Sequence, residues 1–237
     1  MAKRSNRYKE AESKIAEEGS YSPEDAVRLV RETAKTKFDE TVEIHLRTGA
    51  DPRHAEQQVR GVVVLPNGRG KEIKVVVFAS SDGAIMAREA GADFVGDDEL
   101  IAEIEKGWTG FDVAIATPDV MGKIGKLGRL LGRKGLMPNP RTGTVVQAQD
   151  IPRAIVEAKK GRVEFRLDRT AIIHVPVGKV SFTQEQLLEN LSSTVETIVR
   201  ARPSGVKGQF IKSAFLTSTM GPSIRLDLPA TLALKVE

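Results

Sequence analysis

The sequence predicts an α/β protein in which one domain is inserted into another. Between residues 68 and 160, buried-type strand patterns alternate with helix patterns, which is typical of a parallel sheet with helices on its faces. On both sides of this stretch the patterns are strand-rich. We therefore expect a discontinuous flanking domain from residues 1–67 and 161–237, and an inserted domain from residues 68–160.

Composition narrows the possible functions. The chain has 237 residues, of which 40% are apolar and 29% charged, enough for two ordinary domains with buried cores. It contains no cysteine, which excludes disulfides, thiolate catalysis and cysteine-based zinc sites and fits a cytoplasmic protein. The basic start is not followed by an apolar segment, so no secretory signal is expected, and no stretch is long enough to span a membrane.

The first part of the flanking domain begins with a peripheral helix pattern from Lys3 to Glu18. A second helix is indicated by Ser22 at the cap position and Pro23 at the first helical position. Residues 41–48 alternate between apolar and polar side chains, which predicts a strand with one solvent-facing side, and residues 59–65 predict another strand.

The remaining elements follow from hydrophobic period, caps and turn residues. In the inserted domain we expect strands at 73–79, 93–95 and 113–116 and helices at 82–90, 98–106 and 150–160. In the returning part we expect a hairpin of strands 163–167 and 171–177, a helix at 183–201 that opens with a capping box, and strands at 210–219 and 223–228.

A basic run from Val120 to Gln149 carries six cations and no carboxylate, although the net charge of the whole chain is only +4. Glycines recur among these cations, so backbone N–H groups of a loop could approach a partner closely. Such a surface suits a polyanion, and nucleic acid is the commonest one in a cell. The alternative is a solvated loop whose charges only aid solubility. The six cations are Lys123, Lys126, Arg129, Arg133, Lys134 and Arg141.

The two crossings between the domains both carry glycine. Asn67 and Gly68 lie at the first crossing, and Lys160 and Gly161 lie at the second. Two flexible crossings of this kind predict a hinge.

No catalytic site, metal site or cofactor is predicted. His45, His54 and His174 lie in separate elements without a metal-binding spacing, so each is expected to be structural or at the surface. The inserted domain lacks both the phosphate-binding loop motif and the dinucleotide-binding glycine motif. A nucleotide-dependent enzyme that uses the inserted domain is therefore only the alternative hypothesis.

The flanking domain carries better candidates for binding RNA. Phe38 beside Lys37 could stack on a base, or Phe38 could instead close the helix as a core residue. The stretch 217–221 ends a strand with small hydroxyl side chains, a methionine and a glycine, which suit a sugar–phosphate edge. Arg166, Asp168 and Arg169 cluster at the predicted hairpin turn. Both this cluster and the stretch 217–221 could instead be ordinary turns. The candidates are Lys37, Phe38, Arg166, Asp168, Arg169, Thr217, Ser218, Thr219, Met220 and Gly221.

Four stretches of the sequence are distinctive when taken together. They are GRKGLMPNP at 132–140, TMGP at 219–222, KFDET at 37–41, and Asp168 with His174 and Gly178-Lys179. Together they closely resemble the bacterial ribosomal protein L-one family, the protein of the mobile stalk of the large subunit. The resemblance runs nearly end to end, and the four stretches are jointly specific.

The resemblance implies a flanking α/β split sandwich with an inserted Rossmann-like parallel α/β domain joined by a two-strand hinge. It implies binding to large-subunit ribosomal RNA near the exit site for tRNA, assistance to release of deacylated tRNA, and repression through the mRNA of the protein's own operon. It also implies a monomer off the ribosome. The main RNA surface would lie on the flanking domain, and the basic run would make secondary contacts.

The sequence departs from the family pattern at four positions. Arg133 stands where the family usually has proline, Leu167 replaces a usual asparagine, Arg169 a usual lysine and Ala171 a usual glycine.

Overall fold

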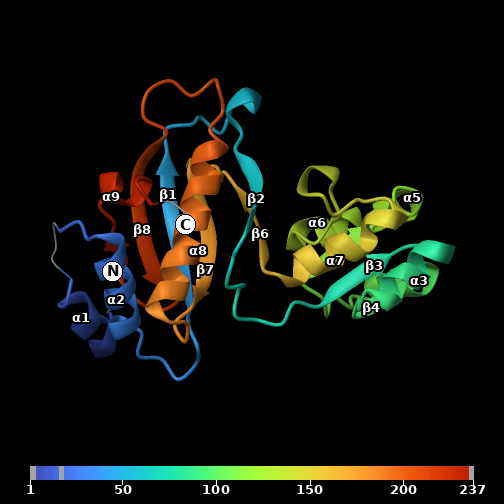
Figure 1. Cartoon of the computed structure of the whole chain (residues 1–237), viewed down its shortest axis with the longest axis horizontal. Helices are drawn as coiled ribbons and strands as arrows, with labels where there is room; N and C mark the ends of the chain where they lie inside the picture. The colour runs from blue at the N-terminus through green and yellow to red at the C-terminus, as the bar shows by residue number, and fades with distance from the viewer. Residues whose placement is uncertain (1–3, 16–18, 235–237) are drawn as a thin grey trace. The chain divides into compact units, whose positions relative to one another are not determined.

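The computed structural model describes residues 4–15 and 19–234, and these form two compact units (Figure 1). The first unit contains residues up to Gly70 together with the segment from Val163 onward, and the second runs from Lys71 to Arg162. The predicted α/β class is confirmed by the mixture of helices with antiparallel and parallel sheets.

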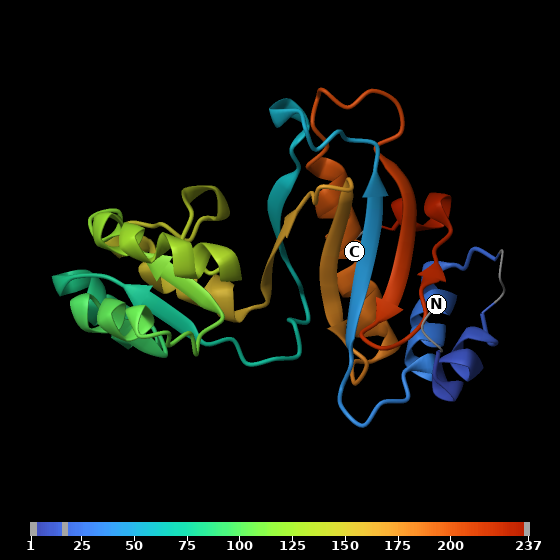
Figure 2. The ribbon, with the colours of Figure 1, turned by 180° about the vertical axis from the view of Figure 1, so that it is seen from behind.

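The first unit is built on a four-stranded antiparallel sheet. Its strand order is β7 (Ile172–Lys179), β1 (Thr41–Thr48), β8 (Ile211–Ser218) and β9 (Ile224–Arg225). Alternate residues of β1 are buried, because one face of the sheet packs against the helices α2 (Pro23–Thr33) and α8 (Gln184–Arg200). The view from behind shows that no helix covers β7, β1 and β8 on the other face (Figure 2). We call this uncovered side the outer face.

The caps of both covering helices follow the sequence rules. Ser22 accepts a hydrogen bond from the Asp25 N–H at the start of α2, and Pro23 occupies the first turn. Thr183 and Gln186 form the predicted capping box of α8, with both reciprocal hydrogen bonds present. These local signals fix where the two helices begin and therefore which residues they turn toward the sheet.

The predicted hairpin around residues 168–170 is wrong. Strand β6 (Arg162–Arg166) pairs with β2 (Arg60–Val64) in a separate two-stranded sheet, whereas β7 pairs with β1. The two neighbours in sequence share only an isolated bridge between Leu167 and Ile173. Closeness in sequence did not decide the pairing of these two strands. Each strand instead pairs with a distant strand, and this places its apolar side in the core of the first unit.

The ends of the chain also differ from the prediction. The expected helix over Lys3–Glu18 is helical only as α1 (Asn6–Glu12), and residues 1–3 and 16–18 lie outside the described part. The last predicted strand is cut to the two residues of β9, because Asp227 caps a short helix α9 (Leu228–Leu232) with Pro229 in its first turn. A 3₁₀ turn at Ala55–Gln57 was not predicted.

The second unit is a three-layer α/β fold. Its parallel sheet has the order β4 (Phe94–Gly96), β3 (Val75–Phe78), β5 (Val113–Ala116). Separate apolar clusters lie on the two faces of this sheet. The predicted parallel sheet with helices on both faces is confirmed. The first cluster packs under α4 (Asp98–Glu105), α5 (Met121–Ile124) and α6 (Gly128–Lys134), and the second under α3 (Ser81–Glu89) and α7 (Ile151–Lys159).

Candidate nucleic-acid interface

One end of the outer face brings together two of the predicted binding segments. The loop that carries Lys37 and Phe38 leads into β1, and the turn after β8 carries Met220. Thr41 and Thr219 lock the segments together, since the N–H of Thr41 donates to Thr219 Oγ1 at 3.0 Å and the N–H of Thr219 donates to the Thr41 carbonyl at 3.0 Å. Segments 178 residues apart in the sequence therefore meet where β1 begins and β8 ends, and we call this end of the outer face the edge.

The buried carboxylate of Glu40 holds this edge in place. Only 2% of Glu40 is exposed, and its Oε2 accepts the N–H of Met220 at 2.9 Å. Burial alone would raise the pKa of Glu40, but hydrogen bonds, led by the one from the Met220 N–H, outweigh it and lower the pKa below its ordinary value. Glu40 is therefore a charged anchor that orients the Met220 turn, a role that its sequence context did not suggest.

The side chains held at this edge are exposed and apolar. Phe38 is 55% exposed and Met220 is 52% exposed. The alternative that Phe38 closes the helix as a core residue is therefore wrong. Two large apolar side chains that are each more than half exposed are available to contact a partner.

The packing of the turn after β8 requires a glycine at position 221. A Cβ atom at this position would lie 2.4 Å from Ser218 Oγ. A side chain there would force the Ser218 hydroxyl to move, so a bulky substitution at Gly221 tests the turn as well as any partner.

The other predicted binding segment lies at the opposite end of β1. Arg47 pairs with Ile172, whereas Thr41 pairs with Lys179, so six residues of strand, about 20 Å, separate the two ends. The predicted main surface is thus not one cluster. Arg166 and Arg169 are exposed at this far end.

Asp168 organises the turn at the far end. Its Oδ1 accepts the N–H groups of Thr170 at 2.8 Å and Ile172 at 2.7 Å. Burial would raise the pKa of Asp168, but these bonds and that from the Thr170 hydroxyl outweigh it and lower the pKa. Ala171 adopts a left-handed conformation with a φ of 63°, which strains a residue with a Cβ by about 1–2 kcal/mol. Glycine would adopt it without that strain.

A line of polar side chains crosses the outer face between the two ends. His174 Nε2 lies 3.5 Å from Asp168 Oδ2, and His174 Nδ1 lies 2.7 Å from His45 Nδ1. His45 Nε2 in turn lies 2.9 Å from Thr217 Oγ1. Sequence reasoning placed both histidines at structural or surface positions and missed their contact. The only signal was that each points to the polar side of an alternating strand, and the register that joins them is not local.

This histidine pair should make stability depend on pH. Burial, and then the nearby charge of His174, lower the pKa of His45, while Glu43 opposes the shift. At pH values between that lowered pKa and about 6.5, the unfolded chain binds more protons than the folded one. The contribution of His45 to the free energy of unfolding is therefore fully present above about pH 6.5 and is lost as the pH falls through this window. We expect a lower melting temperature at pH 5.5 than at pH 7.5.

The variant His45→Gln should lose part of that fall, and His54→Gln, which changes an exposed histidine, should keep it. Differential scanning calorimetry across this range provides the measurement. The carboxylates Glu40 and Asp168 have lowered pKa values and titrate below this pH range, so they do not contribute to the change in melting temperature within it. An unchanged fall in His45→Gln would contradict the assignment.

The basic run is helical from residue 121 to residue 134, so the expectation of a loop with free N–H groups is wrong for this part of the run. Residues 121–134 form α5, a 3₁₀ turn and α6, and the left-handed Gly135 ends them with a φ of 70°. Ile124, Leu127 and Leu131 are buried against the sheet, and this burial outweighs the low helix propensity of the glycines.

The cations of the run differ in their surroundings. Lys123 Nζ pairs with Asp97 at 2.7 Å and with Asp98 at 3.0 Å, which raises its pKa. Lys134 Nζ donates to Thr109 Oγ1 at 2.5 Å. Within the part of the chain that the structure describes, the exposed cations Lys126, Arg129 and Arg133 have no ion pair. The side chain of Arg141 lies outside the described residues.

The predicted hinge residues do not share one environment. Asn67 and Gly68 are tied to α8: Asn190 Oδ1 accepts the N–H of Asn67 at 3.0 Å, and its Nδ2 donates to the Gly68 carbonyl at 3.1 Å. At the second crossing Lys160 closes α7, and Gly161 is left-handed with a φ of 93°.

No helix within the described residues is both long and apolar enough to cross a membrane. Residues 4–15 and 19–234 also hold no group of three or more histidines and carboxylates that could bind a metal ion.

Comparison with known proteins identifies the family. Residues 30–222 match the ribosomal protein L1p/L10e family. The chain is 53% identical to a protein of Dehalococcoides mccartyi named large ribosomal subunit protein uL1, over 99% of both chains. It is also 53% identical to the protein of that name from Chloroflexus aggregans, over the full length of both chains. The chain therefore belongs to the ribosomal protein L1p/L10e family.

Proposed function

We propose that this protein is a structural, non-catalytic component of the large ribosomal subunit in the cytoplasm, and that it binds ribosomal RNA on the outer face of its first unit. The observation that carries the proposal is the edge where Glu40 and Thr41 hold the Met220 turn beside β1, with Phe38 and Met220 exposed. The names of the relatives support the ribosomal setting.

The chemistry of this edge suits folded RNA. Phe38 offers a ring on which a base can stack, and Lys37 offers a cation beside it. Thr217 and Thr219 carry hydroxyl groups toward the same end of the sheet, where 2′-hydroxyl and phosphate groups are natural partners. At the far end Arg166 and Arg169 are exposed cations, so a partner that spans the face can contact both ends.

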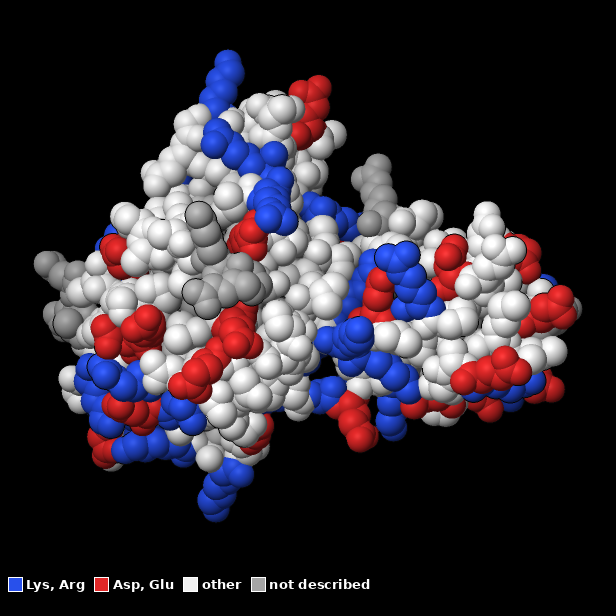
Figure 3. Space-filling view, viewed as in Figure 1, with Lys and Arg blue, Asp and Glu red and all other residues white. Residues whose placement is uncertain are grey.

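The opposite side of the first unit is a poorer surface for a polyanion. Figure 3 shows acidic and basic side chains interspersed on the side of α8 and α2. Several of them neutralise each other there, such as Arg28 with Asp25 at 2.8 Å and Arg200 with Glu196 at 2.5 Å. Charge pairing therefore favours the outer face as the RNA surface.

The α5–α6 segment supplies a second RNA surface in this proposal. Its glycines at 122, 125, 128 and 132 are solvent-facing, and a Cβ at each would meet nothing within 4 Å. Nothing within the second unit requires these glycines, although each costs a helix about 0.5–1 kcal/mol relative to alanine. Close approach of an RNA backbone beside Lys126, Arg129 and Arg133 would account for them.

Replacing Gly125 and Gly132 by alanine should separate stability from binding. We expect each change to raise the free energy of unfolding by about 0.5 kcal/mol, because neither glycine has a positive φ and both have open space. We also expect RNA affinity to fall several-fold, as measured by filter binding. Gly205→Ala, which adds a methyl group in ordinary contact in the first unit, is the control. Unchanged affinity would remove this segment from the RNA surface.

Two further roles, repression of the protein's own operon and assistance to tRNA release, are included in the proposed function. A face that recognises one RNA fold also binds a similar fold elsewhere, so we include repression through the protein's own mRNA. Assistance to tRNA release near the exit site would use hinge motion of residues 68–160 against the flanking domain, with the protein a monomer off the ribosome. Because Asn190 ties down Asn67 and Gly68, we place the pivot of the first crossing after Gly68.

The test is a footprint of the full-length protein on large-subunit ribosomal RNA, with shuffled RNA of equal length as competitor. Protection of one folded region that survives excess competitor is the expected result. Own-operon mRNA and deacylated tRNA serve as further competitors for the two further roles. Equal affinity for shuffled RNA, or a thermal shift with nucleotides and none with RNA, would overturn the proposal and favour the enzyme alternative.

A further inference from the structure

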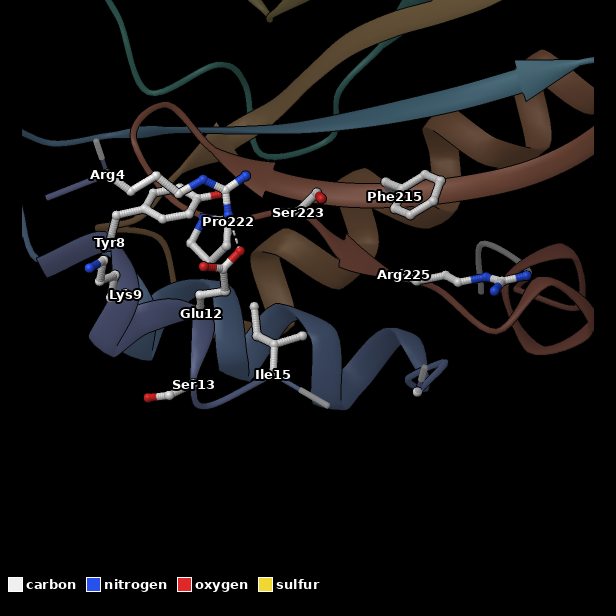
Figure 4. Close-up of a pocket in the computed structure, with 11 residues that line it drawn as sticks. Arg4, Tyr8, Lys9, Glu12, Ser13, Ile15, Phe215, Pro222, Ser223 and Arg225 are labelled. Atoms are coloured by element: carbon white, nitrogen blue, oxygen red, sulfur yellow. Dashed lines mark hydrogen bonds and ion pairs between the residues drawn. The ribbon is translucent and has the colours of Figure 1, made fainter. Parts of the chain in front are cut away.

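A cavity of about 740 Å³ opens beside the outer face, between α1 and the strands β8 and β9 (Figure 4). Its volume lies within the range of roughly 300–1,000 Å³ that is typical of small-ligand sites. Tyr8 comes from α1, Phe215 lies in β8, and Pro222 lies in the turn that joins the two strands. These three side chains give the cavity flat apolar surfaces.

The charges of the cavity favour an anion. Among the described residues that line it, the carboxylate is that of Glu12, which is already paired with Arg4. Arg4 also lies over the ring of Tyr8 at 4.7 Å from the centroid. Lys9 and Arg225 line the cavity as well, and within residues 4–15 and 19–234 neither has an ion pair. Among the described lining residues, Lys9 at one end of the cavity and Arg225 at the other therefore remain available to a ligand (Figure 4).

The cavity is continuous with the proposed RNA surface. Phe215 pairs across the sheet with His45, which belongs to the polar line on the outer face. Pro222 directly follows Gly221 in the Met220 turn. An RNA that covers this face reaches the mouth of the cavity without leaving the sheet.

We propose that this cavity receives an unpaired nucleotide of the RNA bound on the outer face. The base stacks against Phe215, and its phosphate lies against Arg225, which pairs with Phe215 across β8 and β9, because aromatic faces bind bases and free cations bind phosphates. This inference rests on the proposed function. A free mononucleotide has the same chemistry, and we commit to the RNA because the cavity adjoins the RNA face.

The experiment uses the full-length protein and the large-subunit RNA fragment that its footprint defines. The adenine analogue 2-aminopurine replaces each unpaired nucleotide of the fragment in turn, and its fluorescence reports stacking. We expect one position to be quenched on binding. Phe215→Leu and Arg225→Gln should abolish that quenching and weaken binding by about 10-fold. Phe38→Ala, outside the cavity, should weaken binding but keep the quenching in the RNA that remains bound.

Three results would overturn the inference. One is unchanged quenching and affinity in both cavity variants, with their melting temperatures intact. Another is tight binding of adenosine 5′-monophosphate that Arg225→Gln removes, which would assign the cavity to a free nucleotide. The third is loss of binding in the cavity variants with no quenched position, which would assign it to another contact. If the wild-type protein shows no preference for ribosomal RNA, the proposed function fails first and separately.

Discussion

Replacing Phe38 by alanine is expected to weaken binding of large-subunit ribosomal RNA by about 1–3 kcal/mol and to leave thermal stability nearly unchanged. The ring is 55% exposed, so its removal takes little apolar surface out of the core. Its stacking on a base would be lost entirely. Isothermal titration calorimetry with the footprinted RNA fragment and a thermal melt of the free protein measure the two effects.

Val199→Ala is the matched control for Phe38→Ala. Val199 is a 40% exposed apolar residue near the end of α8, on a helix that packs against the covered face of the sheet. Its replacement should change neither affinity nor melting temperature appreciably. A melting temperature that collapses in Phe38→Ala while RNA affinity per folded molecule stays constant would contradict the stacking role.

Replacing Asn190 by leucine is expected to lower the free energy of unfolding by about 3 kcal/mol. Asn190 is fully buried, and its side chain bonds three backbone groups: the N–H of Asn67 and the carbonyls of Gly68 and Val177. Leucine has a similar volume but no polar atoms, so all three groups would lose their partner. Urea denaturation followed by circular dichroism measures the loss.

Ser193→Ala, one helical turn further along α8, provides the comparison. The hydroxyl of Ser193 donates to the Val64 carbonyl at 3.2 Å in an exposed position, so its removal should cost less than about 1 kcal/mol. Equal losses in the two variants would show that water replaces Asn190 as partner. A large loss in Asn190→Leu alone would support the anchor that places the pivot after Gly68.

The elements that were predicted well are those whose signal lies within the element itself. The alternation of residues 41–48 and the capping box at Thr183 gave β1 and α8 with little error. The basic run shows the limit of such signals, because glycine propensity indicated a loop while Ile124, Leu127 and Leu131 formed helices by burying themselves. Packing outweighed propensity there, and packing is not visible in a window of sequence.

The candidate binding residues were found from residue type and from the family resemblance, but their arrangement was not. The sequence could not place Asp168 at the far end of β1 from Phe38, since that follows from the register of β1 with β7. It could not show that Glu40 anchors Met220 or that His45 meets His174. Each of these contacts joins residues more than 120 positions apart.

By itself the sequence determined the α/β class, the parallel sheet of the second unit, most helix starts and the chemistry of the exposed candidates. Those properties depend on period, caps and side-chain type, which act over a few residues. Only the tertiary structure decided which strands pair, which face of the sheet stays open and where the cavity between α1 and β8 forms. The physical reason is that pairing and burial are settled by competition among distant segments for the same core.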